Sequence, residues 1–310
     1  MASAPDLPVI DLRGIYSDYD GVAALQGIDL AIKPGEVHAL IGEHGAGKST
    51  LASVLSGFVR PRTGKILIEG HSQPNYSLIH AKRNGIHMVY QQPQINESVS
   101  VAENIFYMQR HRRRFPWYSR RKTEHNAEEY IERRGFNIDP RMKARYLSPS
   151  DKTVLDILKN IIETPNVLIL DEALERLSND SLLKITAILE ELRAAGTAIV
   201  VVTHRVDDIY TYANRVTVLK EGLKLLTTDI DNISKINLIR VAYTQFEVES
   251  VRKQVDAEFR RYLRFNDAIL QRLPVNIIVV DPSLVVKLVN ESCRETFGLE
   301  ERQLPGLTLR

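Results

Sequence analysis

Residues 42–50 read GEHGAGKST, between an apolar run at 36–42 (EVHALIG) and apolar residues that recur at helical spacing from Leu51 onward. Glycines let successive backbone N–H groups turn toward a phosphate, Lys48 adds a positive charge, and the Ser49 hydroxyl can ligate Mg²⁺. A helix that starts here also points its positive end at the same anion. The alternative, a glycine turn with an incidental lysine, explains less of the pattern. The stretch therefore predicts a phosphate-binding loop made of Gly42, Glu43, His44, Gly45, Ala46, Gly47, Lys48, Ser49 and Thr50.

A second apolar run, VLILDE at 167–172, ends in two acids. Beside a phosphate loop, Asp171 is expected to hold a metal ion through water and Glu172 to polarise an attacking water. The alternative is an acidic strand end that caps the following helix.

Composition limits the protein classes that need to be considered. The chain has 310 residues, of which 44% are hydrophobic and 26% charged, the balance of an ordinary globular protein. A net charge of +2 gives no argument for nucleic-acid binding, and one cysteine, Cys293, excludes an internal disulfide framework. No apolar stretch is long enough to cross a bilayer, and the first residues lack the layout of a signal peptide. We therefore expect a cytoplasmic protein that reaches a membrane only through a partner.

The chain changes character along its length. Up to about residue 228, short β-branched runs alternate with amphipathic helical patterns, which is typical of an α/β domain. The runs 36–42, 166–172 and 197–204 read as buried parallel strands, and three earlier runs separated by Gly and Pro turns read as antiparallel strands. A more polar helical insert spans about 92–148.

Beyond residue 228 two further segments are predicted. Residues 229–268 carry apolar side chains at spacings of three and four, which predicts a helical linker with one apolar face: Val248, Val251, Val255, Phe259 and Tyr262. Residues 269–310 contain two strand-like runs around an Asp281-Pro282 turn, followed by a short helix.

Taken in order, GEHGAGKST, VYQQ (89–92), SVAENIF (100–106), LSPSDKT (147–153), VLILDE and VVVTH (200–204) resemble the ATPase domain of ABC transporters. The phrases EVHALIGE and SVAENIF are most similar to sugar importers of the ribose, galactose and xylose type. The resemblance implies an α/β P-loop fold for residues 1–228, with a mixed sheet core, an antiparallel β subdomain and the insert as helical subdomain.

The resemblance also implies roles for single residues. Tyr19 would stack on adenine, although a solvent-facing strand tyrosine is the alternative. Gln91 would reach the metal and the attacking water, with Gln92 as the competing match. His204 would bind the terminal phosphate, although a strand-end histidine can be purely structural. The implied catalytic residues are Lys48, Gln91, Glu172 and His204, with ATP as the nucleotide and Mg²⁺ held by Ser49, Gln91 and Asp171.

Family ATPases work as dimers and dock a membrane permease on the helical subdomain, so a second ATPase domain and a permease at the inner face of the membrane are the implied partners. The insert carries an arginine run at 112–114 followed by Arg120, Arg121 and Lys122. We interpret this run as a solvated face near a partner or acidic lipid rather than as a nucleic-acid surface.

The match departs from the family at the signature loop, defined here as Leu147, Ser148, Pro149, Ser150 and Asp151. The family sequence is Leu-Ser-Gly-Gly-Gln, and this loop closes over the ATP of the other subunit. A Cβ at Ser150 hinders close backbone approach, and Asp151 puts an acid near an anion. Locally, Ser150 or Asp151 is expected to cap the following helix. Glu175 and Arg176 add charge to a segment that normally packs at the dimer interface, so we expect normal Mg-ATP binding but weakened turnover.

Residues 269–310 resemble the first part of a PAS sensor domain.

The motifs of residues 1–228 make an ABC importer ATPase the first hypothesis. The alternative is an ATP-binding regulatory switch with a signalling partner at the PAS-like segment, and a nucleic-acid ATPase is the weakest reading.

Overall fold

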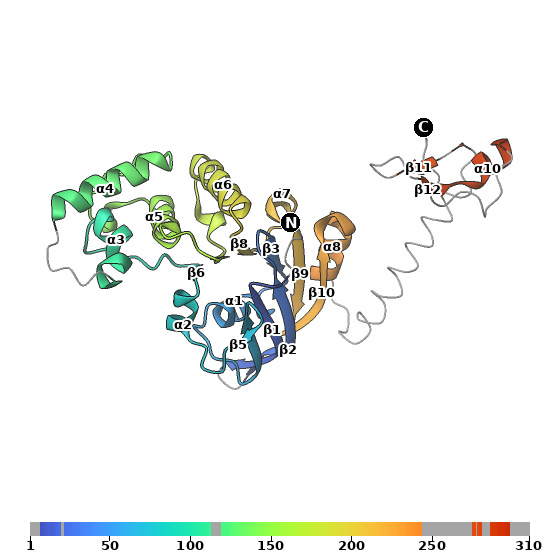
Figure 1. Cartoon of the computed structure of the whole chain (residues 1–310), viewed down its shortest axis with the longest axis horizontal. Coiled ribbons are helices and arrows are strands. Elements are labelled where there is room, and N and C mark those ends of the chain that lie inside the picture. Colours follow the sequence, from blue (N-terminus) through green and yellow to red (C-terminus); the bar gives the residue numbers. More distant parts are fainter. Residues whose placement is uncertain are drawn as a thin grey trace. The chain divides into compact units, whose positions relative to one another are not determined.

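The computed structural model divides the chain into two units, Met1–Thr244 and Gln245–Arg310 (Figure 1). It describes residues 7–19, 22–112, 119–243, 275, 276, 278–280 and 286–297. Among these described residues, no helix is both long and apolar enough to cross a membrane.

The first unit is built on a six-stranded sheet with the order β10-β9-β3-β8-β7-β6. Five strands are parallel, and β10 pairs antiparallel with β9 at one edge. The three runs predicted as buried strands are β3, β7 and β8, and every residue in them is buried. The bounds are β3 Val37–Ile41, β6 Ile86–Val89, β7 Val167–Asp171, β8 Ala198–Val202, β9 Arg215–Lys220 and β10 Leu223–Asp229.

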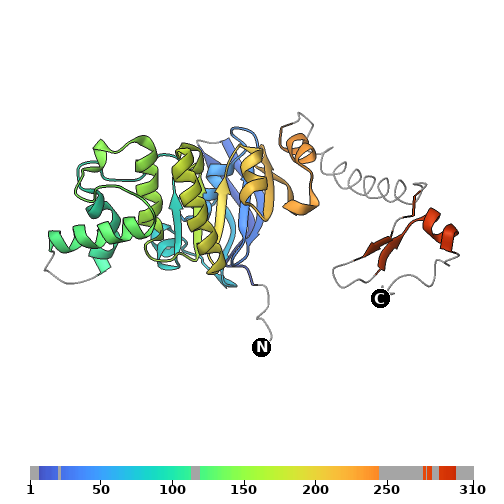
Figure 2. The same cartoon turned by 90° about the horizontal axis from the view of Figure 1, so that it is seen from above.

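Both faces of this sheet are covered, which explains why its central strands are apolar without alternation. In β3, Ala39 and Ile41 belong to the core under the helices, whereas Leu40 belongs to the core on the opposite face. The helices α5 (Pro149–Ile161) and α6 (Asn179–Ala194) run next to each other in the covering layer, green and olive in Figure 2. They are followed by α7 (Val206–Tyr212) and α8 (Lys235–Tyr243).

The other face carries a four-stranded antiparallel sheet with the order β2-β1-β4-β5. Ile10 of β1 pairs with Ile32 of β2 and Ile68 of β4, so the central strand buries one apolar row against both neighbours. This confirms the antiparallel β subdomain. Its elements and the two helices beside them are β1 Ile10–Tyr19, β2 Val22–Ile32, β4 Thr63–Ile68, β5 His71–Ser72, α1 Lys48–Leu55 and α2 Leu78–Arg83.

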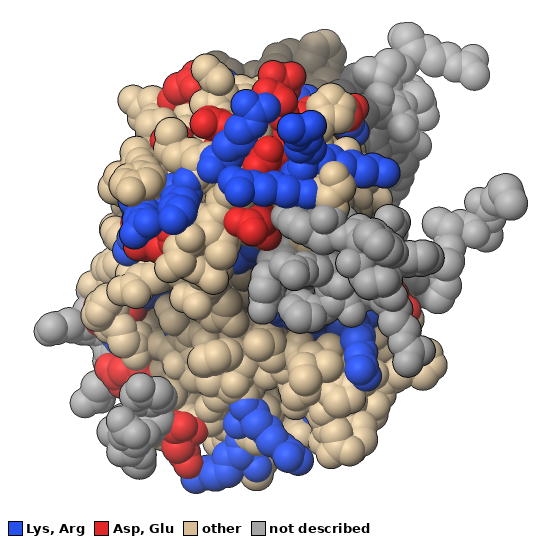
Figure 3. All heavy atoms as spheres, turned by 90° about the vertical axis from the view of Figure 1, so that its left-hand side faces the viewer, with Lys and Arg blue, Asp and Glu red and all other residues tan. Residues whose placement is uncertain are grey.

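The helical insert contains α3 (Val101–Arg112), α4 (Arg120–Arg133) and the 3₁₀ turn η1 (Ala144–Tyr146). Helix α3 packs against α4 and also against α5, so the helical layer continues beyond the predicted end at 148. The surface of this part mixes both signs of charge, with blue and red side chains interspersed in Figure 3.

Ion pairs account for much of this mixture. Arg120 pairs with Glu124 at 2.8 Å, and Arg133 pairs with Glu129 at 2.9 Å. Arg113 and Arg114 lie outside the described residues. The described basic side chains therefore do not form a stripe of one charge.

The first unit ends at Thr244, later than the predicted boundary at 228. The reason is α8, which packs on α7 and β9 and buries Leu238 and Ala242. Residues 235–243 thus belong to this unit and not to a linker. The predicted apolar stripe from Val248 to Tyr262 lies outside the described residues.

In the second unit, β11 (Ile278–Val280) pairs antiparallel with β12 (Val286–Val289), and α10 (Glu291–Phe297) follows. Val286, Val289 and Cys293 form a small buried cluster. The order of two strands and a short helix agrees with the prediction, whereas the Asp281-Pro282 turn lies outside the described residues. The likeness to a PAS domain stays a prediction.

Candidate nucleotide site

The candidate site lies at the carboxyl ends of four neighbouring parallel strands, where ligands bind in open α/β sheets. Strand β3 leads into the loop 42–50, β8 into His204, β7 into Glu172 and β6 into Gln91. The sheet order therefore brings together side chains that are far apart in the sequence.

The turn into α1 depends on Gly47. This residue has φ +98°, and a Cβ on it would lie 2.5 Å from the Ala24 carbonyl oxygen, so a side chain would be both strained and in collision. Helix α1 starts directly after it without a side-chain cap and without an acidic residue in its first turn. The positive end of the helix is thus presented to the loop, as an anion site requires.

The rest of the loop is held by backbone contacts. The Ala46 N–H donates to the Glu43 carbonyl at 3.1 Å, and the Ala46 carbonyl accepts from the Gly222 N–H at 3.1 Å, which ties the loop to the β9–β10 turn. His44 and Gly45 are exposed at its tip, and Thr50 lies in α1.

The Lys48 side chain is buried within the loop. Its Nζ donates to the carbonyls of Gly42 and Glu43, each at 2.9 Å. Burial lowers the pKa of Lys48, and the neighbouring carboxylates of Glu172, Asp171 and Glu175 oppose that shift. The ammonium group is therefore positioned by the loop itself, close to where phosphates would sit.

Ser49 and Asp171 form the expected pair of oxygen donors. The Ser49 Oγ donates to Asp171 Oδ1 at 3.2 Å. Burial raises the pKa of Asp171 to about 6, while the Ser49 hydrogen bond and Lys48 act in the opposite direction. A hydroxyl and a carboxylate oxygen at this spacing fit a Mg²⁺ ion, which prefers hard oxygen ligands and keeps several waters.

Glu172 has an unusual backbone. Its φ is +51°, a conformation that costs a non-glycine residue on the order of 1–3 kcal/mol. Its N–H still donates to the Val202 carbonyl at 3.0 Å, so the strand ladder holds the backbone in place. The side chain is only 17% exposed, and its Oε2 accepts from Gln91 Nε2 at 2.7 Å. Of the two candidate glutamines, Gln91 is therefore the one that reaches the acidic strand end.

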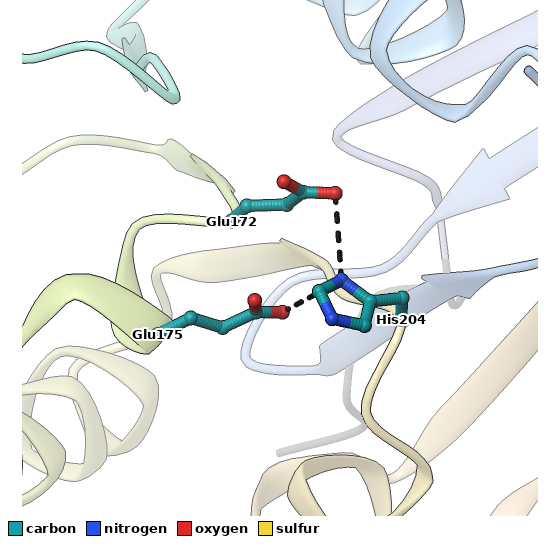
Figure 4. A group of neighbouring side chains, drawn as sticks. All are labelled: Glu172, Glu175 and His204. Atoms are coloured by element: carbon teal, nitrogen blue, oxygen red, sulfur yellow. Dashed lines mark ion pairs between the residues drawn. The ribbon is translucent and has the colours of Figure 1, made fainter. Parts of the chain in front are cut away.

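His204 lies between two carboxylates (Figure 4). Its Nδ1 is 3.7 Å from Glu172 Oε1 and 3.3 Å from Glu175 Oε1. One ligand atom from each of the three side chains lies within 4.8 Å of the others. The sequence reading placed Glu175 only at a dimer interface, although it follows β7 closely and β7 neighbours β8, which leads to His204.

A second contact was also missed. The Tyr243 Oη donates to the His204 carbonyl at 2.6 Å, so α8 supports the segment after β8. The sequence analysis assigns residues 229–243 to a linker, so it gives no reason to place Tyr243 near the site. Tyr19 ends β1 and pairs there with Val22, but its side chain is not among those described.

The signature loop begins helix α5 in a way that differs from the prediction. Ser148, and not Ser150 or Asp151, is the N-cap, because its hydroxyl accepts from the Asp151 N–H at 3.1 Å and donates to the Asp151 carboxylate at 2.7 Å. Ser150 instead turns toward α6, where its Oγ accepts from the Ser178 N–H at 2.9 Å. Leu147 packs against the helical core and Pro149 is the first residue of α5.

Comparison with family models matches residues 25–175 to the description "ABC transporter". Among curated relatives, the ribose import ATP-binding protein RbsA 3 of Rubrobacter xylanophilus is 35% identical over 234 residues, which are 76% of this chain and 47% of that protein. A putative ribose/galactose/methyl galactoside import ATP-binding protein of Rhizobium meliloti is 36% identical over 231 residues, 73% of this chain and 45% of that protein. The chain thus spans about half the length of the curated relatives it matches.

Solved structures share the fold. A dimeric ATP-binding cassette in a post-hydrolysis state, bound to ADP and phosphate, has a TM-score of 0.64 at 22% identity and covers 71% of this chain and 98% of its own. A protein of Clostridium perfringens that is part of an ABC transporter complex has a TM-score of 0.60 at 26% identity, covering 86% of this chain and 96% of its own.

Proposed function

Because the first unit of this chain is an ATPase domain of the ABC transporter family, we propose that the chain binds Mg-ATP at residues 42–50 and hydrolyses it in a dimer. Lys48 and the start of α1 would hold the phosphates. Ser49, Asp171 and Gln91 would hold Mg²⁺, which supplies positive charge to the phosphates when it is bound.

The observation that carries this proposal is the contact between Gln91 and Glu172 at 2.7 Å. It places an amide and a carboxylate from two separate loops next to the Ser49–Asp171 pair. An amide that holds one carboxylate oxygen leaves the other oxygen to accept a proton from an attacking water. His204 then stands at the opposite side of Glu172, where it can donate to the terminal phosphate.

Two substitutions test the proposal. Lys48→Ala removes the buried charge and is expected to abolish ATP binding in a calorimetric titration. Glu172→Gln keeps the Gln91 contact possible but removes the base, so ATP binding should remain while turnover is lost. Glu132→Gln, an exposed acid of α4, is the matched control for charge and should change neither. Full turnover by Glu172→Gln would overturn the assignment of the base.

We further propose that the activity drives a sugar-type importer, with this chain at the inner face of the membrane through a permease. This proposal is supported by the sequence identity of 35% and 36% with ribose-type import proteins and by the presence of the helical subdomain. Two exposed apolar side chains lie on the segments before that subdomain: Phe58 and Ile79 are 63% and 64% exposed, and Phe58 packs edge-on against Tyr90, which precedes the insert, with ring centroids 5.8 Å apart. Because Gln91 follows Tyr90, a permease segment that contacts these side chains could act directly on the Gln91–Glu172 contact.

The permease proposal is tested with a candidate permease in vesicles. Phe58→Ser is expected to weaken the rise in ATP turnover that the permease causes, and to leave turnover of the isolated chain unchanged. If Phe58→Ser lowered ATP turnover equally with and without the permease, the proposal that the permease contacts Phe58 would be wrong.

A regulatory ATP-binding switch is the second candidate. It is favoured by the signature loop, since both Ser148 and Ser150 are engaged within their own subunit. Weak turnover would follow from this arrangement, and this candidate further assumes a signalling partner at the PAS-like segment. ATP binding without turnover, whatever permease is added, would support this candidate against the importer.

A further inference from the structure

Glu175 is placed at the edge of the nucleotide site by the 3₁₀ turn η2 (Leu174–Arg176), which follows β7. Its side chain is only 17% exposed. The Oε1 atom accepts from the Thr203 hydroxyl at 3.0 Å and lies 3.3 Å from His204 Nδ1. A single carboxylate oxygen thus joins the segment after β7 to the two residues that follow β8.

The distances separate the two carboxylates near His204. Glu172 is the more distant one, with 3.7 Å between its Oε1 and Nδ1, and its other oxygen is held by Gln91. Glu175 is closer to Nδ1 and is itself fixed by Thr203, whose hydroxyl also accepts from the Arg205 N–H at 2.9 Å. Glu175 is therefore the carboxylate better placed to hold the imidazole.

A carboxylate is an acceptor only, so its position next to Nδ1 selects a ring that carries a proton on Nδ1, either as the neutral Nδ1–H form or with a second proton on Nε2. The partner of one ring nitrogen fixes the orientation and the chemistry of the other. Both carboxylate contacts use Nδ1, and the side chain of His204 remains 57% exposed. Nε2 is then the nitrogen left for a phosphate group, to which it donates when the ring carries a proton on both nitrogens.

We propose that Glu175 is a positioning residue for ATP hydrolysis, which holds Nδ1 of His204 so that Nε2 meets the terminal phosphate and Glu172 stays free to act on water. The proposal rests on the hydrolysis proposed above. It gives the two acids different tasks: Glu172 acts on the reacting water, and Glu175 acts only through His204.

Kinetics of the purified full chain test the proposal. Glu175→Ala is expected to lower kcat about tenfold, the low end of the loss found when the hydrogen-bond partner of a metal-ligating histidine is removed, with little change in KM for ATP. Glu175→Gln should recover part of that loss, because its amide oxygen can still accept from Nδ1. In a His204→Ala background, Glu175→Ala should cost nothing further, since the residue through which it acts is absent. An unchanged kcat, or an equal loss in both backgrounds, would overturn the proposal.

A measurement without turnover separates this proposal from the hydrolysis itself. In histidine-labelled protein at about pH 8.5, roughly two units above the ordinary histidine pKa, nitrogen NMR distinguishes the two neutral forms of each ring. The His204 signal, identified by its loss in His204→Ala, is expected to report a proton on Nδ1 in the wild type and to shift toward Nε2 in Glu175→Ala. The same form in both proteins would refute positioning by Glu175, whereas absent turnover with the expected shift would refute only the proposed hydrolysis.

Discussion

Replacing Ser150 by alanine and, separately, by glycine distinguishes the two groups that this residue adds to the signature loop. Alanine removes only the hydroxyl, which accepts from the Ser178 N–H at 2.9 Å and lies 3.5 Å from the Ser181 Oγ. Glycine removes the Cβ as well and restores the residue that the family carries at this position. The pair therefore separates a bond within one subunit from a steric obstacle to the other.

The magnitudes follow from these contacts. A hydroxyl–amide hydrogen bond contributes about 0.5–1 kcal/mol in partly exposed surroundings. Glycine in a helix costs about 0.5–1 kcal/mol more than alanine. We therefore expect Ser150→Ala to destabilise the first unit by about 0.5–1 kcal/mol and Ser150→Gly by about 1–2 kcal/mol, which correspond to losses in Tm of about 1–4 °C and 2–8 °C in a domain of this size.

We expect the ATPase rate and the thermal stability of Ser150→Gly to change in opposite directions. If the Cβ blocks closure on the other subunit's ATP, Ser150→Gly strongly raises the ATPase rate although it melts at a lower temperature. Ser150→Ala removes only a bond of about 1 kcal/mol, so it should raise the rate at most about fivefold. Thermal unfolding and steady-state ATPase assays on the same preparations provide both readings. Equal rates for the two variants would refute the steric argument, and unchanged melting of Ser150→Ala would refute the contribution of the hydroxyl.

Three further outcomes follow from the structure. Gly47→Ala should abolish ATP binding because its Cβ would meet the Ala24 carbonyl at 2.5 Å. Gly45→Ala meets the same kind of backbone strain at φ +81° but no collision, so it should lose less, and equal losses in titrations would contradict this. Asp151→Asn removes a negative charge from the signature loop, so ATP-dependent dimerisation in sedimentation should tighten, and weaker dimerisation would contradict the proposed repulsion. Burial holds the pKa of His38 below its usual 6.5, so the unfolded chain binds this proton at a higher pH than the folded chain does. The stability that His38 contributes above pH 6.5 is therefore lost as the pH falls. His38→Gln should make the free energy of unfolding in urea depend less on pH between about 7 and 5.

Much of the site could be predicted because the strands fix it. Glu172 and His204 each follow a run predicted as a buried strand, and neighbouring parallel strands end at one edge of the sheet. Gln91 follows β6, which was not among the predicted strands, so only the family resemblance indicated its role. The end of the first unit at Thr244 could not be predicted, because the pattern of α8 is equally that of a linker helix, and only packing on α7 and β9 separates the two cases.

Side-chain choices within turns were less predictable. Several residues before α5 can cap a helix, and their hydroxyl and carboxylate groups are chemically equivalent candidates. Ser148 is the N-cap, whereas the Ser150 hydroxyl accepts from the N–H of Ser178, 28 positions further along the chain. Similarly, Glu175 reads as a charged surface residue until the 3₁₀ turn places it beside Thr203 and His204. Such contacts depend on tertiary geometry that no local pattern contains.

The contact between Ser150 and Ser178 also bears on the choice between importer and regulatory switch. It ties the signature loop to the start of α6, within the segment that follows Glu172 and Glu175. Breaking a bond of about 1 kcal/mol to let the loop reach a partner's ATP would reduce the closed population only about fivefold. Such a cost slows an importer without stopping it. If turnover proves to be absent, the hydroxyl bond is therefore too weak to be the cause. Within the signature loop, the Cβ of Ser150 and the charge of Asp151 are then the remaining obstacles, and the glycine and asparagine variants remove them one at a time.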